Sequence, residues 1–234
     1  MHDSVRLYQL PPRCNPCILC LYSLLDWLLM QKLTILSLAF CAGFSIMCIE
    51  LLGGKLLAPY FGSSVYVWGS IITVFMLALS IGYLSGGKLS LFRPSLQKYG
   101  FIFIVSAISL MPLIFFSEGI MDWVFERIED PRYGSLLAST LLFLVPTALM
   151  GMIAPYSVRI LIESKDSSGQ TAGFLYFVST LGSAIGTIVT SFYLVLWLKI
   201  DQILWLVFLL MLVAGLVALL VNYIQSIRSV SSED

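Results

Sequence analysis

The chain has 234 residues, of which 59% are hydrophobic and only 11% are charged. Soluble domains carry about 25% charged residues, so this composition excludes an ordinary soluble enzyme, a disordered chain and a disulfide scaffold. Thirteen basic residues balance thirteen acidic ones, so net charge gives no reason to expect nucleic acid as a partner. The composition indicates a polytopic, all-α membrane protein.

Residues 1–32 form an N-terminal extension ahead of the predicted membrane domain. The apolar segment 18–30 contains Asp26 and is too short to cross a bilayer. One interpretation is a short helix that lies in the membrane interface. The other is that translation begins at Met30, because Met30-Gln31-Lys32 is followed by a long apolar run, which leaves residues 1–29 untranslated.

Three cysteines of this extension have a spacing that suits metal or cluster ligation. Cys14, Cys17 and Cys20 form C-x-x-C-x-x-C. Such a site needs a fourth ligand, and His2 is the only histidine of the chain. We therefore expect unligated or acylated thiols near the membrane, with no metal and no cofactor.

Six long runs without charged residues follow, and each can hold one membrane-spanning helix of roughly 20 residues. Helices are the expected spanning form because lipid offers no hydrogen-bond partners to backbone groups. The membrane domain is predicted to occupy residues 33–227, followed by a short cytoplasmic tail, 228–234. The predicted helices are 33–53, 66–87, 99–117, 135–156, 171–197 and 203–225.

The distribution of lysine and arginine predicts the orientation, since cytoplasmic loops are enriched in both. With six helices, nine basic residues fall on the side of the termini and four on the other side. The segment after the third helix is acidic and is expected outside as a loop. Both termini are therefore predicted to be cytoplasmic, in the inner membrane if the source is bacterial. The acidic residues are Glu118, Asp122, Glu126, Glu129 and Asp130.

A five-residue motif returns 96 residues later, at 56–60 and again at 152–156. In both places it ends a predicted helix and is followed by a serine-containing loop and a glycine-rich helix. Because each half then holds three helices, the second half enters from the opposite side. The sequence predicts a 3+3 inverted repeat, the plan of one half of a major-facilitator transporter.

Prolines mark expected breaks in these helices, because proline lacks a backbone donor and disfavours helix at the residue before it. Pro59 and Pro155, within the repeated motif, are expected to end or break the first and fourth helices on opposite membrane faces. Broken ends would expose backbone groups to a substrate, although plain helix termination is the simpler interpretation. Pro112 and Pro146 are expected to kink the third and fourth helices.

Two G-x-x-x-G motifs occupy the equivalent second and fifth helices. The glycines are Gly82 and Gly86 in one and Gly182 and Gly186 in the other. Small residues allow helix backbones to approach closely in lipid, so helix packing is the favoured role. The alternative is that these two helices cross at the centre and move during gating.

Glu50 is the only charged residue well inside a predicted helix. An intramembrane carboxylate costs roughly 3 kcal/mol on insertion scales, so it usually faces a polar interior. We expect Glu50 to face the bundle interior or a polar cavity rather than lipid. A cation or proton site and a structural ion pair or hydrogen bond remain alternative roles.

Several of these motifs together resemble one family. The segments 50–69, 82–89, 151–156 and 175–183 are similar to the membrane part of spermidine-synthase-like proteins, in which a major-facilitator-like domain is fused to a synthase. The resemblance covers about residues 33–225. Two features depart from the family: Ser90 stands where members often have an aspartate, and no segment is long enough for the aminopropyltransferase domain.

The resemblance implies a transporter-like membrane module that handles polyamines or related small cations. Glu50 would attract an amine, and Tyr60, Trp68 and Tyr176 would add cation–π contacts. The alternative is a membrane anchor for a separately encoded aminopropyltransferase-like enzyme. The expected partners are the lipid bilayer and either a second copy or that enzyme, and not nucleic acid. With no nucleophile–base pair in the sequence, the chain is not expected to be an enzyme.

Overall fold

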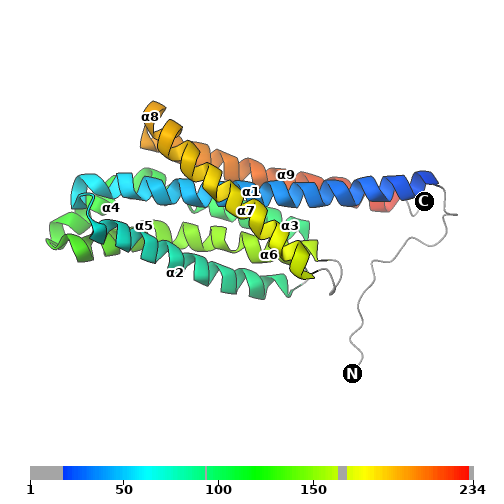
Figure 1. The fold of residues 1–234 in the computed structure, drawn as a ribbon, viewed down its shortest axis with the longest axis horizontal. Helices are drawn as coiled ribbons and strands as arrows, with labels where there is room; N and C mark the ends of the chain where they lie inside the picture. The colour runs from blue at the N-terminus through cyan, green and yellow to red at the C-terminus, as the bar shows by residue number, and fades with distance from the viewer. Residues whose placement is uncertain (1–17, 93, 163–167, 232–234) are drawn as a thin grey trace, which may run out of the picture.

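The computed structural model describes residues 18–92, 94–162 and 168–231, with side chains from 29 to 227 within those ranges. The described residues form an elongated bundle of helices without strands (Figure 1). In chain order the elements are α1 Ile18–Phe61, α2 Val65–Ser90, α3 Leu96–Ile108, α4 Met111–Arg127, α5 Pro131–Gly151, α6 Ile153–Leu161, α7 Ser168–Val189, a π-helical segment Thr190–Leu194, α8 Val195–Trp197 and α9 Ile200–Ser231.

Six helical spans in the described residues are long and apolar enough to cross a membrane, which confirms the expected number of helices. The second half of the bundle includes a span made of α5 and α6 and another made of α7 through α8. The chain is therefore a multi-pass membrane protein in its architecture. The spans are Leu29–Phe61, Val65–Ser90, Leu96–Arg127, Pro131–Leu161, Ser168–Trp197 and Ile200–Ile227.

Most spans are longer than the charge pattern predicted, and the third shows why. It was expected to end at residue 117, but α4 continues to Arg127, so Glu118, Asp122 and Glu126 lie on helical turns rather than in a loop. A charged residue does not stop a helix. The next helix begins after Asp130, which caps α5 by accepting a hydrogen bond from the Arg132 backbone at 2.9 Å.

The N-terminal extension also differs from the expectation of a separate interfacial helix. α1 begins at Ile18 and continues without a break into the first span, since neither glycine nor proline occurs between Ile18 and Ala42. His2, Cys14 and Cys17 lie outside the described residues, as does the side chain of Cys20.

The four prolines act in three different ways. Pro59 lies inside the last turn of α1, which ends at Phe61 and turns at Gly62 with φ of 78°. Pro112 and Pro155 each follow a break within a span, at the starts of α4 and α6. Their missing N–H groups cost little there, because first-turn N–H groups have no helical partner. α5 continues through Pro146 without interruption.

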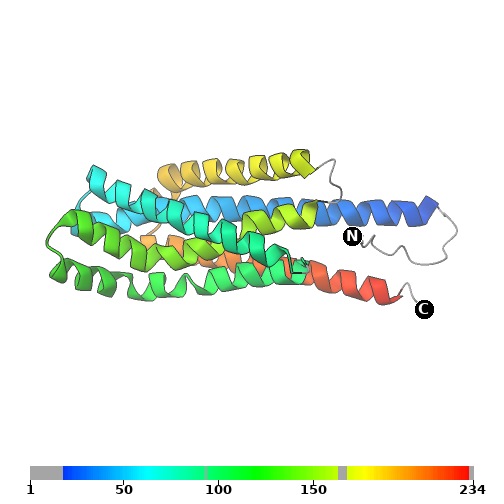
Figure 2. The ribbon, with the colours of Figure 1, turned by 90° about the horizontal axis from the view of Figure 1, so that it is seen from below.

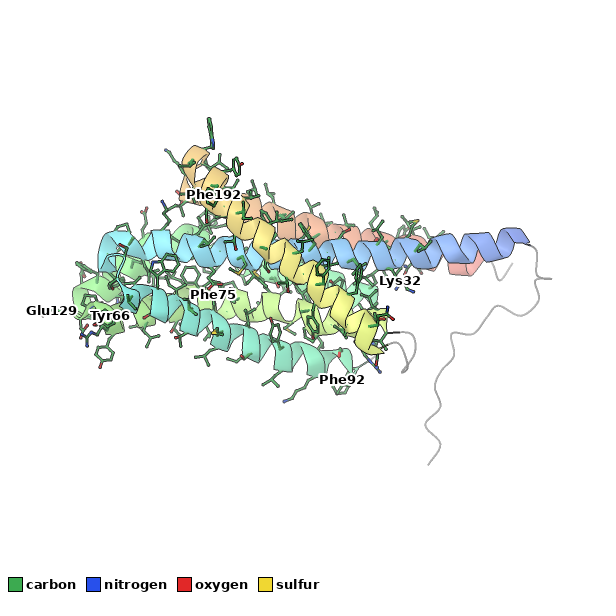
Figure 3. The ribbon with its side chains drawn as sticks, in the orientation of Figure 1. Lys32, Tyr66, Phe75, Phe92, Glu129 and Phe192 are labelled. Atoms are coloured by element: carbon green, nitrogen blue, oxygen red, sulfur yellow. The ribbon has the colours of Figure 1, made fainter. Side chains whose placement is uncertain are left out.

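The bundle is built on three main helix contacts. α2 packs against α5, α1 against α7, and α3 against α9, while α1 also contacts α9, α2 and α5. Figure 1 shows α7 crossing α1 obliquely, and Figures 1 and 2 both show the start of α1 and the end of α9 at the same end of the bundle. Phe75 of α2, labelled in Figure 3, packs against Phe143 of α5, with ring centroids 5.4 Å apart and the rings tilted by 41°.

Both G-x-x-x-G motifs lie at these helix crossings. A β-carbon at Gly82 would overlap the carbonyl oxygen of Ala148, and one at Gly86 would lie 2.6 Å from the carbonyl oxygen of Met152. Because the obstructing atoms belong to the backbone, no side chain can move aside for a larger residue. Backbone therefore touches backbone where α2 crosses the fourth span.

The α1–α7 crossing repeats this arrangement. A β-carbon at Gly182 would overlap the carbonyl oxygen of Phe40, and one at Gly186 would lie 2.7 Å from that of Phe44. Gly43 of α1 contributes from the other side, since a β-carbon there would overlap the carbonyl oxygen of Ser179. The two crossings hold the first and fourth spans against the two glycine-rich helices.

Candidate functional site

Glu50 is half-buried on α1. Among the described residues its carboxylate has no hydrogen-bond or ion-pair partner. It shares one face of the helix with Met47, one turn before, and Gly54, one turn after. Gly54 is covered by the ring of Trp68, since a β-carbon there would lie 2.6 Å from it. Along α1, Glu50 therefore lies between Met47, which lines a cavity, and Gly54, which an aromatic side chain of α2 covers.

That cavity measures about 160 Å³ and lies where α1, α2, the α5–α6 break and α7 meet. Its position follows from the glycine crossings, because the small residues that let the backbones touch leave space beside each contact. None of the residues that line it is charged. They are Ala39, Ala42, Gly43, Ile46, Met47, Leu79, Tyr83, Met150, Gly151, Ile153, Ala154, Leu175, Tyr176, Ser179, Thr180 and Ser183.

Two tyrosines line the cavity, one from α2 and one from α7. Tyr83 of α2 is 49% exposed and Tyr176 of α7 is 52% exposed. Neither hydroxyl has a hydrogen-bond partner in the part of the chain that the structure describes. Ser183 differs, because its hydroxyl lies 3.2 Å from the carbonyl oxygens of both Gly43 and Ser179 and can donate to either. Within the described residues, the two tyrosine hydroxyls are thus among the free polar groups of the cavity, together with the hydroxyls of Ser179 and Thr180.

The four residues expected to bind a cation do not converge. Tyr60 packs on Phe125 of α4, with ring centroids 6.2 Å apart, and is ten residues, or about 15 Å, along α1 from Glu50. Trp68 lies over Gly54, close to the Glu50 face of α1. Tyr176 lines the cavity. Tyr83 was not predicted as a site residue from the sequence. The feature that pointed to it was its position directly after Gly82, a glycine of the G-x-x-x-G motif.

The second copy of the repeated motif has a structural contact of its own. Tyr156 is fully buried and stacks on Tyr99 of α3, with ring centroids 6.0 Å apart. The Tyr99 hydroxyl shares a 2.7 Å hydrogen bond with Ser157, and the Tyr156 hydroxyl accepts one of 3.1 Å from the Ser95 backbone. The two Ala-Pro-Tyr motifs therefore pack against the two ends of the third span, Tyr60 on α4 and Tyr156 on α3.

The surfaces of the spans differ in polarity. In the fifth span 17% of the residues of an apolar 18-residue window are buried within the chain, and in the second span 33%, against 44 to 50% in the other four spans. Along with apolar side chains, α2 and α7 expose polar ones: Thr73, Ser80, Tyr83, Tyr176 and Thr180. The exposed residues in the middles of α3 and α9 are apolar: Phe101, Val105, Ile108, Leu206, Leu209 and Val213. The side of α2 and α7 is thus less suited to lipid.

The end of the bundle where α4 meets α5 carries exposed charges. The Arg132 guanidinium lies 4.4 Å from the centroid of the Tyr66 ring, and Arg127 lies 4.3 Å from that of Trp123. Figure 3 shows Tyr66 and Glu129 together at this end. Within the described ranges, no group of three or more His, Cys, Asp or Glu residues could hold a metal ion.

No protein-family model, no curated protein and no solved structure matches the chain.

Proposed function

We propose that the chain is a transporter-like membrane module for small organic cations. The observation that carries the proposal is Glu50, a half-buried and unpaired carboxylate within a membrane span, one helical turn from a cavity. A charge in this position is costly and is typical of ion, proton or substrate paths. The resemblance to spermidine-synthase-like membrane proteins makes amines the first cargo to test.

The exposed acidic residues of α4 are consistent with a cation as cargo. Glu118, Asp122 and Glu126 lie on successive turns and are exposed. Clustered charges of one sign raise the local concentration of the opposite ion. Cations would collect at this end of the bundle before they enter.

We further propose a 3+3 inverted repeat, in a register other than that of the Ala-Pro-Tyr motif. The contacts support it, because each backbone contact of one crossing has a counterpart in the other. Each residue of the first span is matched with the residue 108 positions later in the fourth span. Each residue of the second span is matched with the residue 100 positions later in the fifth. The matched contacts are Gly43–Ser179 with Gly151–Leu79, Phe40–Gly182 with Ala148–Gly82, and Phe44–Gly186 with Met152–Gly86.

A second copy of the chain would supply the missing wall of the pathway. One six-helix unit leaves Tyr83, Tyr176 and Thr180 exposed at the cavity. A two-fold pair would place these polar side chains against protein rather than lipid.

Flux measurements test the function directly. The purified protein is reconstituted in liposomes, and uptake of radiolabelled amines, including spermidine, putrescine and butylamine, is compared with that of empty liposomes. We expect uptake above the empty control for at least one amine. No uptake of any amine by folded protein would reject transport and favour the alternative of an anchor for a separate enzyme.

Reporter fusions test the orientation. Both termini are proposed to be cytoplasmic, because basic residues outnumber those of the other side by nine to four. A fusion after Asp130 is expected to report the outer side, and one after Asp166 the cytoplasm. The measurement uses two reporters, a phosphatase that is active in the periplasm and a fluorescent protein that is active in the cytoplasm. If both fusions report the same side, the proposed orientation is wrong.

A further inference from the structure

We propose that the cavity between Tyr83 and Tyr176 binds a single ammonium group on a short apolar body, so that the cargo is a small monoamine rather than a polyamine. This inference rests on the proposed function and narrows its substrate class. Three properties of the cavity support it: its size, its charge and the groups that its walls offer.

The size of the cavity limits the ligand. A closed apolar cavity of about 150 Å³ accommodates benzene, and the cavity here measures about 160 Å³. A ligand of roughly six non-hydrogen atoms therefore fits it. A long polyamine chain would extend beyond the cavity along the exposed sides of α2 and α7.

The charge of the surroundings limits the ligand further. No charged residue lines the cavity, and Glu50, one turn beyond Met47, supplies one negative charge. One ammonium group is therefore compensated. A second ammonium in the same apolar surroundings would be buried without a counter-charge, which costs several kcal/mol. An anion finds no positive partner at all.

The two tyrosines supply the recognition. An ammonium group near an aromatic face gains about 0.5 to 2 kcal/mol, depending on how far it is desolvated. Both tyrosine hydroxyls can accept a hydrogen bond from the ammonium, and so can the Ser183 hydroxyl, which itself donates to a backbone carbonyl. The apolar walls, among them Met47, Leu79 and Met150, suit the hydrocarbon body of an amine.

A matched pair of ligands tests the charge argument. Butylamine and putrescine share a four-carbon chain and differ in the second ammonium. Binding of each radiolabelled amine to the purified protein is measured at equilibrium, apart from any flux. We expect butylamine to bind at least tenfold more tightly. Equal or tighter binding of putrescine or spermidine would overturn the inference and leave a cation transporter intact.

Variants at the cavity test the location of the site. Tyr83→Leu and Tyr176→Leu are each expected to weaken butylamine binding between about twofold and thirtyfold, the range that follows from the cation–π energy. Tyr83→Phe is expected to retain most of the binding because it keeps the ring. Tyr133→Leu, at an exposed tyrosine outside the cavity, is the control and should bind as the unaltered protein does.

The outcomes of binding and flux are separable. Tyrosine-dependent butylamine binding without flux would support the site and reject the transport function. Binding that is unchanged in both leucine variants would overturn the site, even if flux of some amine is found. Occupation by a lipid acyl chain alone would give no saturable butylamine binding, and would also overturn it.

Discussion

Gly82→Ala is expected to destabilise the protein by about 1 to 3 kcal/mol or more, the usual cost of overpacking. The added methyl group would overlap the carbonyl oxygen of Ala148 and lie 2.9 Å from the Cα of Gly151. Both obstacles are backbone atoms, so α2 and the fourth span must separate. Thermal unfolding in detergent, followed by tryptophan fluorescence, should show a midpoint several degrees lower.

Gly87→Ala is the matched control for this experiment. Gly87 lies in the same helix, but no atom is within 4 Å of the position of its added methyl group. Alanine favours helix over glycine by about 1 kcal/mol, so this variant should be as stable as the parent or more so. Gly182→Ala and Gly173→Ala form the same comparison in α7. Equal midpoints within each pair would contradict the backbone contact as the source of stability.

Glu50→Gln is expected to lower amine flux at least tenfold while leaving the fold intact. The amide keeps the shape of the side chain but removes its charge, so a bound cation loses its counter-ion. The midpoint of thermal unfolding should remain equal or rise, because a neutral side chain is less costly to place in a membrane span than a carboxylate. Flux in liposomes and unfolding in detergent are measured on the same preparation.

Glu118→Gln is the control for charge. It makes the same chemical change at an exposed position on α4, so only a modest loss of local cation concentration is expected. A structural role of Glu50 would give the opposite pattern, with a lower midpoint and normal flux in the protein that survives. Full stability together with full flux would remove Glu50 from both roles.

The number of membrane-spanning helices and their approximate positions along the chain could be predicted from the sequence, because burial in lipid forbids long charged segments. The ends of the helices could not. Glu118, Asp122 and Glu126 suggested a loop, but a helix can continue past the hydrocarbon with its charges in water, and α4 ends only at Arg127, shortly before Asp130 caps α5.

The candidate site was predicted only in part. Glu50 was predicted because a single charged residue in an apolar run can be recognised from the sequence alone. Tyr83 was missed, because a tyrosine in a membrane helix gains meaning only when Tyr176, 93 positions away in the chain, is known to line the same cavity. The Ala-Pro-Tyr motif suggested one register for the repeat, whereas the glycine contacts favour another.

The α1–α7 crossing has a mechanical consequence. At Gly182 the backbone of α7 contacts that of α1, so α7 can tilt about this point. The part of α7 from Gly182 back to Ser168 is about 21 Å long. A tilt of about 10° around Gly182 would carry the Ser168 end about 4 Å and Tyr176 about 1.5 Å. On the other side of Gly182 the π-helical turn Thr190–Leu194 can take up the bend. A small rotation of α7 about this contact would thus widen or narrow the mouth of the cavity, and it would also move the buried Leu175 on the same part of the helix.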